Sequence, residues 1–224
     1  MKRQSTAITA GLLLTSLLVG SIAWADTPER LNAGAETLQA LAKIPEADKG
    51  IPQDLIKKAH CIVVVPSLKG AALGVGAEYG RGFVSCRQRV GWTAPAAVKV
   101  EGGSFGFQIG GSETEVVMLV MNEKGMQRLL SNKFTLGADA TIAAGPVGRS
   151  AAAKTDAAMT AEILSYSRSR GLFAGVSLSG ATLREDDSAN KDMYGKALTN
   201  REILSGKTKP PAVARTFMSA LPKL

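Results

Sequence analysis

Glycine residues interrupt the segments of this chain that otherwise have the pattern of β-strands. The 224 residues include 24 glycines, while aromatic residues make up only 5%. In residues 104–110 the side chains of Phe105, Phe107 and Ile109 alternate with small or polar residues, which is the period of a strand. Glycine inside a strand costs stability, so its repeated use indicates bends, bulges or close backbone contact. The core must be built largely from small and aliphatic side chains.

Apolar runs and helix signals around these segments complete the expected fold. Residues 61–65 and 116–121 are continuous apolar runs, typical of strands that are buried on both faces. Pro66 is expected to end the first run. Helix patterns occupy residues 27–44, 52–59 and 123–130, and two more follow at 199–204 and after Pro210. The expected N-caps are Thr27 for the first helix and Asn122 for the third, and Thr199 with Glu202 is expected to form a capping box. Residues 136–147 and 172–183 have the composition of further strands. We therefore predict one α+β domain: a glycine-rich, mainly antiparallel and barrel-like sheet, flanked by short N- and C-terminal helices.

The first 25 residues have the pattern of a signal peptide. Lys2 and Arg3 precede an apolar stretch, and Ala23-Trp24-Ala25 has the small-x-small pattern of a cleavage site. The apolar stretch is shorter than the roughly 20 residues that span a bilayer. The expected organisation is a signal peptide over 1–25, an amphipathic helix over 26–50, a main domain over 51–195 and a helical extension over 196–224. The alternative is an uncleaved anchor. Cleavage near Ala25 predicts a periplasmic or secreted protein.

Two cysteines and one histidine restrict the chemistry of the chain. Cys61 and Cys86 can form a disulfide after export, closing a loop of about 25 residues. The alternative is two buried thiols in neighbouring strands, because Cys61 lies in an apolar run. With His60 as the single histidine, most zinc sites and any multi-histidine centre are excluded. No metal or other cofactor is expected.

No residue pattern in the chain predicts a catalytic site. A serine hydrolase would need His60 as its base, yet His60 adjoins a buried strand and no Gly-x-Ser-x-Gly elbow is present. The carboxylate pairs Glu113/Glu115 and Asp186/Asp187 are better explained as solvated charge. Residues 148–155 resemble a phosphate-binding loop but lack the glycine before the lysine. We expect a protein that is not an enzyme.

The net charge favours anionic partners. Lys and Arg number 27 against 19 Asp and Glu, a formal net charge of +8. Without Lys2 and Arg3 of the signal peptide the excess is +6, which lies from Cys86 onward and includes pairs such as Arg87/Arg89, Arg168/Arg170 and Lys207/Lys209. The basic residues are not interleaved with exposed aromatic residues, so nucleic acid is not an expected partner.

Several ordered motifs give the chain a resemblance to a known family. They extend over about 145 of the 224 residues and comprise an opening helix at 51–59, Gly91-Trp92-Thr93-Ala94-Pro95, Gly145-Pro146-Val147-Gly148-Arg149, the segment 166–177 and Met193-Tyr194-Gly195. The chain resembles the SYLF-domain family of lipid-binding proteins, which includes bacterial proteins and eukaryotic membrane- and actin-associated proteins. One motif departs from the family pattern, with Thr93 in place of serine.

The resemblance implies binding of membrane lipid by a basic surface, with phosphoinositides (phosphatidylinositol derivatives) as the ligands of the eukaryotic members. Those members have a lysine-rich N-terminal helix, whereas here Arg30 and Lys43 are balanced by Glu29 and Glu36. Export would also remove phosphoinositides and actin as partners. Anionic phospholipid at a membrane face is then the expected ligand.

The residues selected for lipid binding are basic and lie in or near the family motifs: Lys57, Lys58, Lys69, Arg149, Arg168 and Arg170. The alternative for each is an ordinary solvated charge or, for Arg149, a structural role in the turn after Pro146. The predicted function is non-catalytic, peripheral association with anionic phospholipid. One alternative is an envelope structural or scaffolding protein that binds another protein, and another is an enzyme that acts on lipids.

Overall fold

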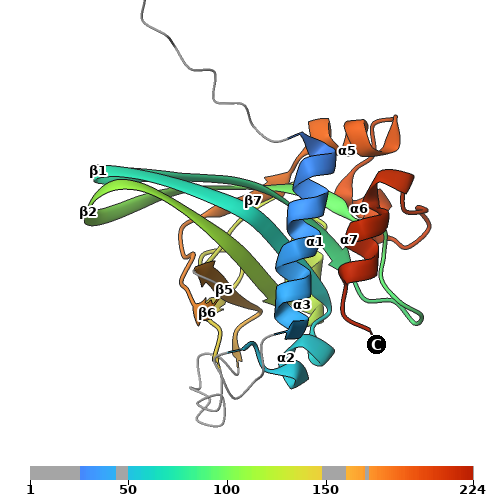
Figure 1. The fold of residues 1–224 in the computed structure, drawn as a ribbon, viewed down its shortest axis with the longest axis horizontal. Helices are drawn as coiled ribbons and strands as arrows, with labels where there is room; N and C mark the ends of the chain where they lie inside the picture. The colour runs from blue at the N-terminus through green and yellow to red at the C-terminus, as the bar shows by residue number, and fades with distance from the viewer. Residues whose placement is uncertain (1–25, 44–49, 148–159, 170–171, 224) are drawn as a thin grey trace, which may run out of the picture.

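The centre of the fold is a ribbon of two long antiparallel strands. The computed structural model describes residues 26–43, 50–147, 160–169 and 172–223. Strand β1 (Cys61–Cys86) pairs with β2 (Ala96–Val120) almost from end to end. The middle of this ribbon extends away from the rest of the molecule, to the left in Figure 1.

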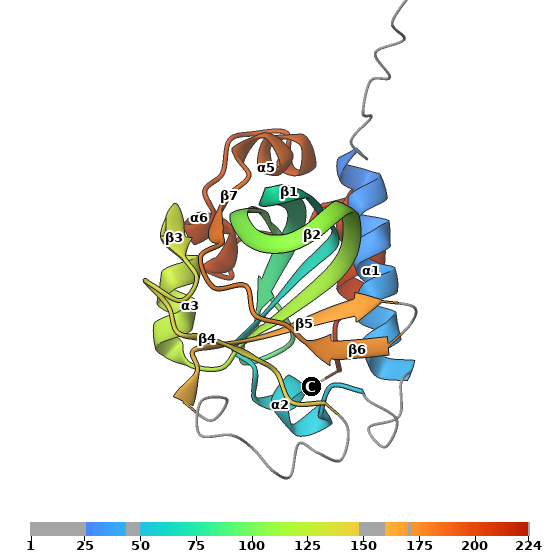
Figure 2. The same ribbon diagram turned by 90° about the vertical axis from the view of Figure 1, so that its left-hand side faces the viewer.

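The ribbon coils so far that the two ends of β1 become neighbours. The backbone N–H of Arg87 donates a hydrogen bond of 2.7 Å to the carbonyl oxygen of His60. Near this point, a Cβ atom on Gly82 would lie only 2.1 Å from the carbonyl oxygen of Val64. Glycine permits this close approach because it has no side chain. The predicted close backbone contact is confirmed, and the sheet is a half-barrel (Figure 2).

Shorter strands extend the sheet along the other edge of β2. They are β3 (Lys133–Thr135), β4 (Ile142–Ala144), β5 (Ile163–Ser169), β6 (Leu172–Gly175) and β7 (Thr182–Glu185). β5 pairs with the C-terminal end of β2 and β7 with its N-terminal part. β4 and β6 both pair with β5, and β3 pairs with β7. Only the β4–β5 pair is parallel among the described strands, so the prediction of a mainly antiparallel sheet is confirmed.

Helices surround the sheet. They are α1 (Thr27–Lys43), α2 (Gln53–Lys58), α3 (Glu123–Leu129), α5 (Asp187–Tyr194), α6 (Asn200–Leu204), the 3₁₀ turn η3 (Ala212–Ala214) and α7 (Arg215–Ala220). α1 and α7 lie side by side and cover one face of the sheet (Figures 1 and 2). Phe217 of α7 meets Phe83 of β1 edge-on, with ring centroids 5.6 Å apart. The N- and C-terminal helices therefore share one domain with the sheet.

The sheet separates two hydrophobic clusters. Val63 and Val65 belong to one cluster, which also contains Leu129 of α3 and residues of α6. Ile62 and Val64, on the opposite face, belong to the cluster that α1, α2 and α7 cover. The prediction that residues 61–65 are buried on both faces is confirmed.

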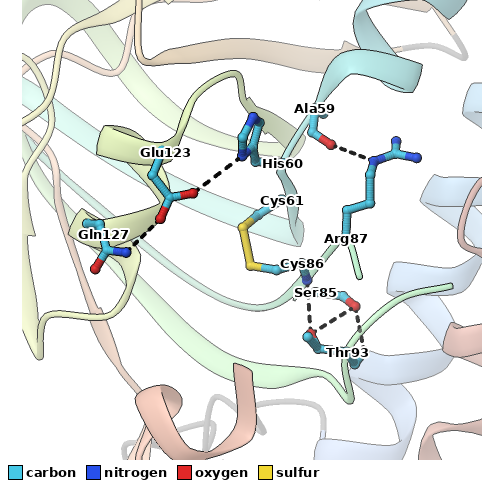
Figure 3. Close-up of a disulfide and its surroundings, with 9 residues drawn as sticks. All are labelled: Ala59, His60, Cys61, Ser85, Cys86, Arg87, Thr93, Glu123 and Gln127. Atoms are coloured by element: carbon cyan, nitrogen blue, oxygen red, sulfur yellow. Dashed lines mark hydrogen bonds and ion pairs between the residues drawn. A yellow bond between two sulfur atoms is a disulfide. The ribbon is translucent and has the colours of Figure 1, made fainter. Parts of the chain in front are cut away.

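A disulfide joins the two ends of β1. Cys61 and Cys86 are bonded and completely or nearly completely buried (Figure 3). Next to it, the hydroxyl of Ser85 donates to the carbonyl oxygen of Thr93 at 2.7 Å. The structure therefore has the disulfide and not the alternative of two free thiols. A covalent link at this position holds the coiled ribbon closed.

The structure corrects two local predictions, one about where a strand ends and one about where a helix begins. Pro66 does not end the first strand, because a register shift between Val65 and Leu68 places the proline where the pairing is irregular. The cap of α1 is Asp26 and not the expected Thr27, since the Asp26 side chain accepts from the N–H of Glu29 at 2.9 Å. The capping box of Thr199 and Glu202 is confirmed.

Two predicted strands are shorter than expected. Residues 136–147 contribute only β4 and an isolated bridge, and residues 172–183 contribute β6 and the start of β7. Both segments contain a glycine with a positive φ, 86° at Gly137 and 90° at Gly180. Because this conformation turns the backbone out of a strand, each segment is divided.

Candidate functional site

Helix α2 presents two of the predicted lipid-binding residues to solvent. Leu55 and Ile56 are buried against the sheet, so the neighbouring Lys57 and Lys58 side chains lie on the exposed side. Both lysines are in the last helical turn, where a positive charge is favourable next to the unpaired carbonyl groups. This pair is the most accessible part of the predicted set among the described residues.

Other predicted residues face a carboxylate. Lys69 is half-buried on β1, directly opposite Glu113 on β2. Arg168 of β5 donates to both carboxylate oxygens of Glu115, at 2.6 and 2.8 Å. Glu115 also accepts from the hydroxyl of Thr37 in α1 at 2.8 Å, so Arg168 helps to connect the sheet with the helix.

The structure does not bring the whole predicted set together. Lys57 and Lys58 lie on α2, whereas Lys69 and Arg168 lie on strands and face acidic partners. Arg149 and Arg170 lie outside the described residues. The role of each residue in lipid binding stays a prediction.

Arg87 places the β1–β2 connection beside α2. Its guanidinium donates to the carbonyl oxygens of Ile56 and Ala59, both at 3.0 Å, and so binds the C-terminal end of the helix (Figure 3 shows the Ala59 bond). The guanidinium carbon also lies 4.8 Å from the centre of the Trp92 ring. Burial lowers the pKa of Arg87, yet the group stays charged because arginine is not deprotonated in proteins.

The C-terminal segment joins the same end of the molecule. The indole N–H of Trp92 donates to the carbonyl oxygen of Pro222 at 2.9 Å. Figures 1 and 2 both place α2 and the C-terminus at one end, with α5 at the opposite end. We call the surface formed by residues 53–59, 87–92 and 218–223 the hairpin end.

The hairpin end concentrates positive charge. Its three segments contain one acidic residue, Asp54, and five basic residues: Lys57, Lys58, Arg87, Arg89 and Lys223. Within the described residues, Arg87 is held by carbonyl oxygens, so its charge is not cancelled by a carboxylate. Several unbalanced cations on one surface attract an anionic partner.

The sequence indicates Arg87 and Arg89 only as a charged pair and does not single out Lys223. The available signal was local: Arg89 and Val90 precede Gly91, which predicts a tight turn between two strands. Nothing in the sequence shows that this turn, α2 and the C-terminus meet, since 130 residues separate Trp92 from Pro222.

A second polar cluster lies at the opposite end of the fold. The buried carboxylate of Asp186 pairs with Arg81 of β1 and with Lys99 of β2, and it accepts from the Ser188 hydroxyl at 2.7 Å. It also caps α5 through the N–H of Ala189. Burial raises the pKa of Asp186, but the hydrogen bonds from Arg81 and Ser188 outweigh that effect and leave the pKa below its usual value.

Replacement of Asp186 by asparagine is expected to destabilise the protein in a pH-dependent way. A lowered folded-state pKa means that ionised Asp186 stabilises the fold above about pH 4 and that this contribution is lost as the pH falls through the folded-state pKa. Asp186→Asn should therefore cost about 2–3 kcal/mol of unfolding free energy at neutral pH, because it leaves Arg81 and Lys99 without a carboxylate. The cost should shrink below pH 4.

Urea denaturation at pH 7 and at about pH 3 measures this difference. The neighbouring exposed residue gives a matched control, since Asp187→Asn removes the same charge outside the cluster. An unfolding free-energy difference between Asp186→Asn and wild type that is equal at both pH values would contradict the assignment.

The described residues contain no group of three or more His, Cys, Asp or Glu side chains placed to hold a metal ion. Within the same residues, no helix has the length and apolar character needed to cross a membrane.

Comparison with known proteins identifies the family of the chain. The family model described as "Ysc84: Las17-binding protein actin regulator" matches residues 101–224, which is more than half of the chain. The chain belongs to this family. The match confirms the resemblance to SYLF-domain proteins, because the Ysc84 and SYLF descriptions refer to the same domain.

Two similar proteins come from yeast and human. LAS seventeen-binding protein 3 of Saccharomyces cerevisiae is 36% identical over 169 residues, which cover 74% of this chain and 37% of the relative. SH3 domain-containing YSC84-like protein 1 of Homo sapiens is 34% identical over 176 residues, covering 78% of this chain and 51% of the relative. The chain thus spans about half or less of these relatives, and the name of the yeast protein describes a binding protein.

Proposed function

We propose that this Ysc84-family protein binds anionic phospholipid at a membrane surface, without catalysis, through the hairpin end. The observation that carries the proposal is the charge of this surface, five basic residues against one acidic residue. A cation close to an anionic membrane contributes on the order of 1 kcal/mol, so a few such residues support reversible binding. Lys57 and Lys58 supply the exposed charges of α2.

The proposal includes export. The N-terminal pattern of Lys2, Arg3 and Ala23-Trp24-Ala25 supports cleavage before Asp26. The disulfide between Cys61 and Cys86 supports an oxidising compartment, where such bonds persist. Expression in a bacterium followed by mass spectrometry of the periplasmic fraction tests this point. A chain that begins at Asp26 is expected, and an uncleaved chain retained in the cytoplasm would contradict export.

Residues 26–224 are the unit for binding experiments. All described helices and strands, and both hydrophobic clusters, lie within this range. Co-sedimentation with vesicles of phosphatidylcholine and increasing phosphatidylglycerol is expected to show binding that rises with the anionic fraction. The same binding should weaken as salt shortens the screening length from about 10 Å at 0.1 M to about 3 Å at 1 M.

A protein partner is the second candidate, because the family description and one relative's name refer to binding Las17. For this chain the corresponding function would be scaffolding in the cell envelope. A predominantly apolar protein interface would not weaken steeply with salt. Failure to bind vesicles of any composition would therefore favour this candidate over lipid binding.

A further inference from the structure

Val90 occupies the tip of the β1–β2 hairpin. Arg87 and Trp92 form a bridge across the hairpin, and the N–H of Gln88 donates to the carbonyl oxygen of Gly91 at 3.0 Å. Gly91 has a φ of 75°, which completes the tight turn. The turn therefore directs Val90 away from the sheet.

The exposure of Val90 is exceptional. Its relative exposure is 89%, and it is the one large hydrophobic side chain among the described residues that is classed as exposed. A single apolar residue on a surface is common. Val90, however, lies at the tip of a fixed turn and next to basic residues. A side chain in this position can enter a membrane while the basic residues contact its surface.

The hairpin is fixed on several sides. Arg87 is bonded to α2 and Trp92 to the C-terminal segment, as described above. A Cβ atom on Gly206 would lie 1.7 Å from the side-chain nitrogen of Gln88, so the chain after α6 packs closely against the turn. Because the turn is already held in place, insertion of Val90 would require little further ordering.

A hollow of about 520 Å³ lies next to the tip, between the turn and the C-terminal segment. Trp92, Met218 and Leu221 supply apolar parts of its lining. Arg89 and Lys223 supply positive charge, and no carboxylate is present among its described lining residues. Apolar surface rimmed by cations matches the boundary between the acyl chains and the phosphates of an anionic bilayer.

We propose that the hairpin turn is a membrane wedge: Val90 enters the acyl boundary of an anionic bilayer while Arg89 and Lys223 contact the phosphates. This inference rests on the proposed function and adds an apolar contact to it. The electrostatic attraction by Lys57 and Lys58 falls with salt, whereas the contribution of Val90 does not. The two contributions can therefore be measured separately.

A label at the tip tests insertion directly. Val90→Cys in residues 26–224, labelled with an environment-sensitive fluorophore, is mixed with phosphatidylglycerol–phosphatidylcholine vesicles with and without lipids that carry a quencher high on the acyl chain. The emission should shift to the blue and be quenched by these lipids. Ala138→Cys is the control, because Ala138 is exposed on the loop after β3, outside the hairpin end.

The unlabelled pair Val90→Ser and Ala138→Ser measures affinity. Loss of an inserted valine should weaken vesicle binding roughly tenfold at both low and high salt, while Ala138→Ser should bind like wild type. Vesicle binding by wild type with no blue shift at position 90 and full affinity of Val90→Ser would overturn the wedge and leave head-group binding intact. Absence of wild-type vesicle binding would overturn both proposals.

Discussion

Replacement of both Lys57 and Lys58 by glutamate is expected to abolish vesicle binding by residues 26–224 at low salt. Each lysine contributes on the order of 1 kcal/mol near an anionic surface, and each reversal replaces attraction by repulsion of similar size. The double variant Lys57→Glu/Lys58→Glu should therefore lose about 4 kcal/mol of binding free energy, roughly a thousandfold in affinity. Co-sedimentation with phosphatidylglycerol-containing vesicles measures this loss.

The chain offers a control with the same charge change at the other end of the fold. Lys191 and Lys196 are exposed in or just after α5, which lies far from α2 in Figure 1. Lys191→Glu/Lys196→Glu should keep most of the affinity, losing only the long-range effect of a lower net charge. Equal loss in the two double variants would show that total charge, and not the hairpin end, determines binding.

Replacement of Gly82 by alanine is expected to prevent stable folding. Its Cβ atom would lie 2.1 Å from the Val64 carbonyl oxygen and 2.9 Å from the Val65 Cα atom, both backbone atoms of the paired ribbon. Because these atoms cannot move without separating the two ends of β1, we expect a loss of at least about 4 kcal/mol of unfolding free energy. Thermal and urea denaturation of Gly82→Ala measure the loss.

Gly103 on β2 provides the matched substitution. A Cβ atom on Gly103 would have its nearest neighbour at 3.9 Å, an ordinary contact distance. Gly103→Ala should change the unfolding free energy by less than about 1 kcal/mol. Similar stabilities for Gly82→Ala and Gly103→Ala would disprove the close crossing of β1 with itself.

The sequence predicts local structure well where one short pattern determines it. The burial of residues 61–65 on both faces, the Asn122 cap of α3 and the capping box of Thr199 all depend on neighbouring residues. Pro66 wrongly indicates the end of a strand, because tertiary pairing and not local sequence determines the length of β1. The long pairing of β1 with β2 continues past the proline because a register irregularity accommodates it.

The candidate site was less predictable, because it forms from distant segments. Lys57 and Lys58 follow from the helical period of α2, which exposes them by burying Leu55 and Ile56. The compensation of Arg168 by Glu115 depends on the register of β5 with β2. Likewise, the approach of Lys223 to the hairpin depends on the packing of the C-terminal helices, which no local pattern encodes.

The hairpin end is proposed to bind anionic phospholipid by charge. The most direct test is co-sedimentation of wild-type residues 26–224 with vesicles of graded phosphatidylglycerol content at low and high salt. We expect binding that increases with the anionic fraction and decreases steeply with salt. Absence of binding at every composition, or binding that is indifferent to both variables, would contradict it.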